Sequence, residues 1–145
     1  MDLKEYASYD GLGLAALVAK GDVDARELAE CTMRAVEAVN PTLGGVVEAY
    51  TERAGSTADD VADGPFRGVP TMVKDLFHGE AGKPCGNGSR LSAEWVVSVD
   101  TAFYDRIRRS GLINLGRTAT SEFGILGTTE TLAAGITCSP WSAEH

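Results

Sequence analysis

The N-terminal part of the chain carries apolar residues at helical spacing. Leu12, Leu14, Leu17 and Val18 recur in this way before Gly21, and this pattern predicts a helix that ends at the glycine. A second helix is predicted to begin after Asp24, a typical N-cap residue.

The apolar stripe of this second helix comprises Leu28, Cys31, Ala35, Val36 and Val39. Glu27, three residues after Asp24, completes a capping-box pattern. Asn40-Pro41 is expected to end the helix, because the residue before a proline disfavours helical backbone.

Short apolar runs and Gly/Pro-rich stretches follow in the middle of the chain. Residues 44–50 predict a strand, and the polar, alanine-bearing residues 51–63 predict a third helix. From Gly64 the chain is rich in glycine and proline, with one apolar run over residues 69–77. Residues 79–92 are predicted to form a long loop.

Helical and strand patterns also follow one another in the last part of the chain. Residues 101–110 predict a helix and residues 112–115 a buried strand, while the chain from Ala119 onward is expected to be loop-like with short pieces of structure. Helices that alternate with short strands indicate an α/β fold. A length of 145 residues suits about one domain.

The net charge of −8 argues against one class of partner. Residues 1–64 hold 13 acidic and 5 basic side chains, and residues 65–145 hold 8 of each. We expect the acidic part to form solvated helix faces. Because no basic patch is present to neutralise phosphates, nucleic-acid binding is not expected.

Membrane and metal chemistry are not expected either. No apolar run approaches the roughly 20 residues of a membrane span, and the charged N-terminus does not resemble a signal peptide, so we expect a cytoplasmic protein. The three cysteines are widely spaced and only two histidines are present, which predicts reduced thiols and no metal site. Cys31 is expected to serve packing, whereas Cys85 lies in a Gly/Pro loop and is a candidate pocket residue.

Lys74 is the residue with the clearest chemical potential. It lies inside the apolar run, where a charged lysine must be paired or must lose its proton. It is therefore either a structural lysine paired with a carboxylate or a base that accepts a proton. Asp75 is a suitable partner only if the backbone turns, because neighbours on a strand face opposite sides.

Three blocks of sequence carry a resemblance to a known family. They are Gly64-Pro65-Phe66-Arg67-Gly68-Val69-Pro70-Thr71-Met72-Val73-Lys74-Asp75-Leu76-Phe77, then Gly111-Leu112-Ile113-Asn114-Leu115-Gly116-Arg117-Thr118 with Thr120-Ser121-Glu122-Phe123-Gly124, and then Gly127-Thr128-Thr129-Glu130 with Gly135-Ile136-Thr137-Cys138-Ser139-Pro140-Trp141. In order and spacing they resemble the amidase-signature enzymes, the first block being similar to the stretch around the catalytic lysine. The pair Gly88-Ser89 also matches the family.

The resemblance implies the N-terminal portion of one amidase-signature domain. Residues 1–63 would form a mainly helical lead-in, and residues 64–145 would begin the mixed-sheet catalytic core. The family works through a Ser–cis-Ser–Lys triad and an acyl-enzyme, which implies that Lys74 is the base. No cofactor is implied.

The resemblance also implies that the two serines of the triad are missing from this chain. Ser89, Ser121 and Ser139 do not match them, so the chain alone is expected to be inactive and to need a second polypeptide or C-terminal segment with a double-serine motif. It would then be a piece of a nicked or processed enzyme, a deliberately shortened form, or a pseudo-enzyme fragment. From the loop after Lys74 and the stretch around Gly127-Thr128-Thr129, the resemblance suggests Phe77, Cys85 and Thr128 as substrate contacts, with loop packing as the alternative role of each. It also implies an assembled enzyme that can form a homodimer.

Three functions follow from these observations. The first is hydrolysis of small carboxamides, cyclic amides or short amide oligomers. The second is a non-catalytic structural or interaction fragment. The third is membership of an amidotransferase complex of the same family, which works on charged transfer RNA and fits the acidic composition less well.

Overall fold

The structure is a computed structural model that describes residues 1–142. Its elements are α1 (Leu3–Tyr6), α2 (Gly11–Lys20), α3 (Ala25–Leu43), β1 (Val46–Ala49), η1 (Thr51–Gly55), η2 (Ala58–Asp60), β2 (Pro70–Lys74), α4 (Ala102–Arg109), β3 (Ile113–Thr118), η3 (Glu122–Gly124), β4 (Glu130–Thr131) and β5 (Gly135–Ile136). This mixture of helices and strands confirms the predicted α/β class. None of the helices within residues 1–142 combines the length and apolar character needed to cross a membrane.

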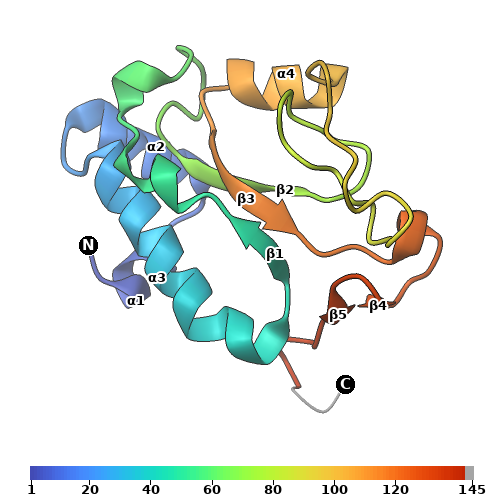
Figure 1. Ribbon diagram of the computed structural model, residues 1–145. Helices are drawn as coiled ribbons and strands as arrows, with labels where there is room; N and C mark the ends of the chain where they lie inside the picture. The colour runs from blue at the N-terminus through green and yellow to red at the C-terminus, as the bar shows by residue number, and fades with distance from the viewer. Residues whose placement is uncertain (143–145) are drawn as a thin grey trace. The chain divides into compact units, whose positions relative to one another are not determined.

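Three strands form a sheet in the order β1-β3-β2, with β3 in the middle (Figure 1). Tyr50 donates a backbone hydrogen bond to Leu115 just past one end of β1, and Ala119 donates one to Gly45 just before the other end. Because sequence numbers rise along β1 as they fall along β3, these two strands are antiparallel.

The second neighbour of β3 runs in the same direction as β3. Ile113 donates to Val69 near the start of both strands, and Asp75 donates to Thr118 near their ends. The connection from β2 to β3 contains α4, as parallel neighbours require a crossover. The sheet is therefore mixed, as the amidase-signature resemblance implies.

Helix α3 starts as predicted but ends later. Asp24 Oδ1 accepts a hydrogen bond from the backbone N–H of Glu27 at 2.9 Å, whereas the Glu27 carboxylate is paired with the ammonium group of Met1 and does not complete the capping box. Pro41 does not stop the helix, which continues to Leu43 before Gly44 takes a left-handed φ of 62°. An interior proline removes its own hydrogen bond and crowds the carbonyl four residues earlier, which can bend a helix without ending it. Here the Gly44 N–H still donates to the Asn40 carbonyl.

The predicted third helix over residues 51–63 is wrong. Two short 3₁₀ turns, η1 and η2, are present instead. The Asp60 carboxylate accepts hydrogen bonds from the backbone N–H and hydroxyl of Thr57 at 2.6 and 3.0 Å. Such local side-chain bonds compete with helix formation. The Gly/Pro-rich loop and the helix over residues 101–110 are found where the sequence predicts them.

The chain divides into two compact units, which are described separately. Unit 1 comprises Met1–Ala38, Ala49–Met72 and Arg106–Leu115, and unit 2 comprises Val39–Glu48, Val73–Asp105 and Gly116–His145. The cores of unit 1 join α3 to β3 through Ala25, Ala29, Met33, Ile113 and Leu115, and join α2 to α3 through Leu14, Leu28 and Val69.

One residue of the predicted apolar stripe is exposed to solvent. Leu28 and Cys31 are fully buried, but Val39 is 48% exposed. Val39 points in nearly the same direction around the helix as Leu28, yet it lies about three turns further along. The buried residues of α3 end at Met33.

Candidate active site

Lys74 is the last residue of β2 and its side chain is exposed. Val73 before it and Asp75 after it are buried, so the strand alternation directs the lysine to the other face. Within residues 1–142 no hydrogen bond or ion pair involves the Lys74 ammonium group. The expectation of a buried, paired lysine is therefore wrong for the described part of the chain, and its role as a base stays a prediction.

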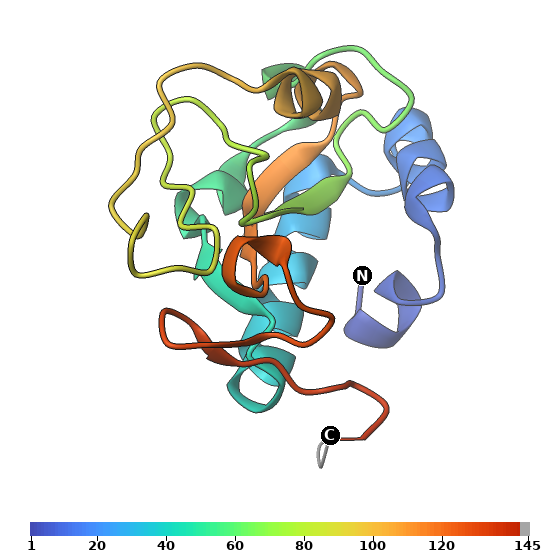
Figure 2. The ribbon, with the colours of Figure 1, turned by 90° about the vertical axis from the view of Figure 1, so that its right-hand side faces the viewer.

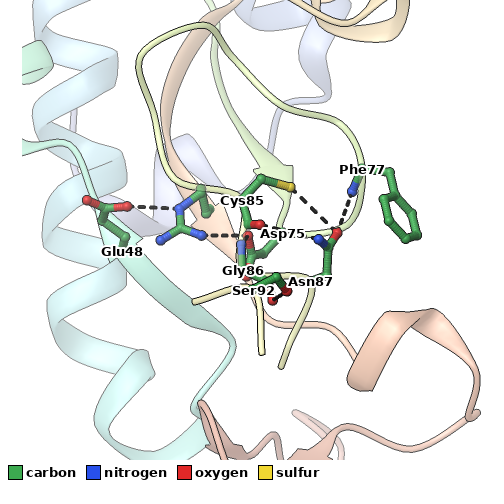
Figure 3. Close-up of polar contacts among 8 residues, drawn as sticks. Glu48, Asp75, Phe77, Cys85, Gly86, Asn87 and Ser92 are labelled. Atoms are coloured by element: carbon green, nitrogen blue, oxygen red, sulfur yellow. Dashed lines mark hydrogen bonds and ion pairs between the residues drawn. The ribbon is translucent and has the colours of Figure 1, made fainter. Parts of the chain in front are cut away.

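The buried carboxylate of Asp75 pairs with Arg117 (Figure 3). Arg117 lies on the central strand β3, and its Nε also donates to Glu48 Oε2 of β1 at 2.8 Å. Burial by itself lowers the pKa of the Arg117 guanidinium, but the charge of Asp75 and the hydrogen bonds from both carboxylates outweigh burial and raise it above its ordinary value. The arginine therefore stays charged and ties together β1, β3 and the end of β2.

The segment after the lysine contains a loop that is buried along five consecutive residues, 85–89. Loops normally lie on the surface because their backbone groups need water. Here Asp75 Oδ1 accepts a hydrogen bond from the backbone N–H of Gly86 at 2.7 Å, which replaces water. Ser92 supplies a second bond, from its hydroxyl to the Gly86 carbonyl at 2.7 Å.

Asn87 is the centre of this buried loop and is only 1% exposed. Its Oδ1 accepts from the backbone N–H of Phe77 at 2.9 Å, and its Nδ2 donates to the Cys85 carbonyl at 3.3 Å. Its own carbonyl accepts from the Phe123 N–H at 2.8 Å. Phe77, Asn87 and Phe123 all have a positive φ, between 50° and 55°. Such backbone strain persists only when the surrounding contacts hold it, and it concentrates at functional sites.

Two side chains thus tie the end of the lysine strand to the buried loop in opposite directions. Asp75 reaches from the strand end to the Gly86 N–H, and Asn87 reaches back from the loop to the Phe77 N–H (Figure 3). We call this reciprocal pair of hydrogen bonds the bracket. It encloses the turn that follows Lys74.

The three serines that do not match the catalytic serines of the family each form a hydrogen bond within the described residues. Ser89 donates to Glu122 Oε1 at 2.6 Å, and Ser121 donates to the Leu126 carbonyl at 2.9 Å. Ser139 Oγ accepts from the Trp141 N–H at 3.3 Å. Each of the three hydroxyl groups therefore has a hydrogen-bond partner within the described part of the chain.

The three predicted substrate contacts lie in different surroundings. Phe77 is 52% exposed, three residues after Lys74, whereas Cys85 is buried with its thiol 3.6 Å from Asn87 Oδ1. Burial and, to a lesser degree, the charge of Asp75 raise the pKa of the Cys85 thiol. Thr128 is exposed and lines a hollow of about 350 Å³ together with residues of β4 and β5. These two strands form a short hairpin, drawn in red in Figure 2.

A smaller hollow of about 180 Å³ lies beside the bracket. It is lined by Val47, Asp75, Gly86, Gly88, Ser89, Ala93, Arg117, Ala133 and Ala134. The polar groups of the Asp75–Arg117 pair face this hollow, and Thr128 lines the other one. No cluster of three His, Cys, Asp or Glu side chains suited to a metal occurs within residues 1–142.

Sequence reasoning did not identify Arg117, Glu48 or Asn87 as site residues. Arg117 lies in one of the sequence blocks that resemble the family, and Asn87 lies between two glycines in a loop. A buried ion pair between residues 42 positions apart leaves no local pattern in a sequence. The sequence feature that could have identified Asn87 is its position between Gly86 and Gly88, in the loop that follows the candidate lysine.

Comparison with known proteins identifies the family. The family model described as Amidase matches residues 27–145. The chain belongs to the amidase family. Among relatives of this amidase chain, the 6-aminohexanoate-cyclic-dimer hydrolase of Paenarthrobacter ureafaciens is 36% identical over 136 residues, covering 92% of this chain and 27% of the relative.

Two further matches support the assignment. A glutamyl-tRNA(Gln) amidotransferase component from Synechococcus sp. (strain WH7803) is 34% identical over 142 residues, covering 88% of the amidase chain and 28% of the relative. A solved structure of 6-aminohexanoate cyclic dimer hydrolase complexed with substrate matches with a TM-score of 0.87 and 34% identity, covering 99% of this chain and 29% of that one. The amidase chain thus spans less than a third of the length of these relatives.

Proposed function

We propose that this chain supplies Lys74 as the base of an amide-bond hydrolase that works through a Ser–cis-Ser–Lys triad. The observation that carries the proposal is the family match over residues 27–145, within which Lys74 ends β2 with its side chain free of the Asp75–Arg117 pair. A second polypeptide or a further segment would supply both serines. The substrates would be small carboxamides, cyclic amides or short amide oligomers, and no cofactor would take part.

The chemistry follows from what a serine needs in order to attack an amide. Neutral Lys74 Nζ would take a proton from the bridging serine, which takes one from the nucleophilic serine as that oxygen attacks the carbonyl carbon. The proton would then pass to the leaving amine as the C–N bond breaks, and water would release the acyl group. Removing water from around a lysine favours its neutral form, so a covering segment would also activate the base.

The first test is a chimera in which residues 1–145 replace the matching region of the Paenarthrobacter ureafaciens hydrolase. We expect it to hydrolyse the 6-aminohexanoate cyclic dimer, because that relative shares 36% identity with this chain. Lys74→Ala should lower kcat by on the order of a hundredfold or more, as loss of a general base does. Because the Lys74 side chain is exposed, the urea concentration at the midpoint of unfolding should be the same for the variant and the wild-type chimera.

The control for this experiment is Lys20→Ala, which removes an exposed lysine at the end of α2 in unit 1. It should leave kcat within about twofold, since surface substitutions away from a site have small effects. A chimera that folds and hydrolyses the dimer equally well without Lys74 would show that this lysine is not the base. A folded chimera without any amide hydrolysis would favour the non-catalytic fragment.

The amidotransferase function is a second candidate, supported by the 34% identity to a component of a glutamyl-tRNA(Gln) amidotransferase. It would use the same triad to release ammonia from an amide donor. The net charge of −8 makes direct contact with transfer RNA unfavourable. Glutaminase activity that depends on glutamyl-tRNA and accessory subunits would establish this function in place of the first.

A further inference from the structure

The side chain of Lys74 is exposed at the end of β2, and a long exposed side chain can adopt many rotamers. A base must be held close to its productive position, since a displacement of about 1 Å can cost on the order of a hundredfold in rate. Within residues 1–142, no hydrogen bond or ion pair fixes the ammonium group of Lys74, although its backbone belongs to β2. Its position therefore depends on what holds the residues that follow it.

Those residues are held by the bracket at both ends of a short turn. Asp75 is 6% exposed and Asn87 is 1% exposed, so neither hydrogen bond of the bracket competes with bulk water. Buried hydrogen bonds to a charged group are stronger than neutral ones, and Asp75 Oδ1 accepts from both Gly86 and Arg117. The turn itself is tight, with Leu76 donating to the Lys74 carbonyl at 2.8 Å.

The loop side of the bracket is equally constrained. Its glycines allow an approach that a larger residue would prevent: a Cβ on Gly86 would lie 3.1 Å from Asp75 Oδ2, and one on Gly88 would lie 2.7 Å from the Thr120 carbonyl oxygen. The hydrogen bond from Ser89 to Glu122 fixes the far end of the loop. The strand end is thus tied to a support that cannot shift easily.

We propose that Asp75 and Asn87 are positioning residues, which hold the turn after Lys74 so that its amine meets the bridging serine. The inference rests on the proposed function, because it concerns the same lysine. Neither residue touches the substrate or takes part in the proton transfer. Their effect is on the geometry of the base.

The test uses single and double variants of the chimera. Asp75→Asn keeps the acceptor for Gly86 but removes the charge that pairs with Arg117, and Asp75→Ala removes both. Asn87→Ala removes the acceptor for Phe77. Each alanine variant should lower kcat by about tenfold while KM stays within about threefold, and Asp75→Asn should retain more kcat than Asp75→Ala.

The double alanine variant distinguishes positioning from two separate effects. Because both side chains hold the same turn, loss of one already frees it, so the double variant should lose much less than the product of the two single losses. Asp59→Asn is the matched control, since Asp59 pairs with Arg67 in unit 1 and has no contact with the bracket. It should leave kcat within about twofold.

A second measurement tests the bracket in the 145-residue chain alone. The amide hydrogens of Phe77 and Gly86 should exchange slowly in the wild type, and Asn87→Ala should accelerate exchange at Phe77. Fast exchange at both amides in the wild type would overturn the inference.

The kinetic outcomes separate this inference from the proposed function. Active, folded variants with wild-type kcat would overturn the positioning role alone, as would an effect confined to KM. A folded wild-type chimera without hydrolysis would overturn the proposed function, and the positioning role with it.

Discussion

At the scale of single residues, the three cysteines differ in their surroundings although none is in a disulfide. Cys31 and Cys85 are 0% and 2% exposed, whereas Cys138 is partly exposed. Burial raises the pKa of Cys85, so its reactive thiolate forms only at higher pH than the ordinary 9.0. A shared residue type therefore gives different chemistry at each position.

The raised pKa of Cys85 predicts that the free energy of unfolding depends on pH. A thiol whose pKa is raised by folding holds its proton more tightly in the folded state. Its contribution to the free energy of unfolding is therefore complete below pH 9 and is lost as the pH rises above 9. Urea unfolding of the wild type and of Cys85→Ser should show a difference in free energy that shifts against the wild type above pH 9. A pH-independent difference for Cys85→Ser would contradict the prediction.

Individual residues also show where sequence reasoning reaches its limit. Lys74 stands out in the sequence because a lysine inside an apolar run is unusual, and the family blocks agree with that choice. Its exposure did not follow from the sequence, because the hydrophobicity of the run hid the alternation of the strand. The Asp75–Arg117 pair depends on two strands meeting, and only the fold specifies that contact.

At the scale of elements, the buried loop over residues 85–89 tolerates little change in backbone conformation. Gly82 and Gly88 both have a positive φ, 77° and 65°. A Cβ on Gly82 would have nothing within 4 Å, whereas one on Gly88 would lie 2.7 Å from the Thr120 carbonyl oxygen. A comparison of alanine substitutions at these two glycines therefore distinguishes backbone strain from steric overlap.

We predict that Gly88→Ala destabilises the chain more than Gly82→Ala. Both variants should lose about 1 kcal/mol because alanine disfavours left-handed backbone. Gly88→Ala should lose about 1–3 kcal/mol more, since the loop must move away from Thr120. Urea unfolding monitored by circular dichroism measures both losses. Equal losses would show that the loop is not packed as tightly as its geometry indicates.

Elements were predictable from the sequence where local signals agreed. Helices α2 and α4 and the strand β1 were predicted because the spacing of their apolar residues indicated each element, and Gly21 marked the end of α2. Residues 51–63 were predicted as helix because alanines outweighed the competing bonds of Thr57 and Asp60. The short final strands β4 and β5 pair only with each other, and two residues each carry too little pattern to predict.

At the scale of the whole molecule, large exposed apolar side chains are distributed unevenly between the units. In unit 1 they are Leu3, Tyr9 and Leu12. Those in unit 2 include Leu91, Val99, Ile125, Leu126, Leu132, Ile136 and Trp141. Exposed apolar groups in such numbers are typical of surfaces that another polypeptide covers. Under the proposed function, the part of the enzyme that carries the serines would cover the surface of unit 2.

Trp141 offers the most direct measure of that covering, since it is 95% exposed. We predict that hydroxyl-radical footprinting oxidises Trp141 rapidly in the 145-residue chain and at least about fivefold more slowly in the chimera, because burial removes the ring from solvent. Tyr9 of unit 1 is 41% exposed and should be oxidised at similar rates in both. Equal oxidation of Trp141 in both proteins would mean that the serine-bearing part does not pack on this surface.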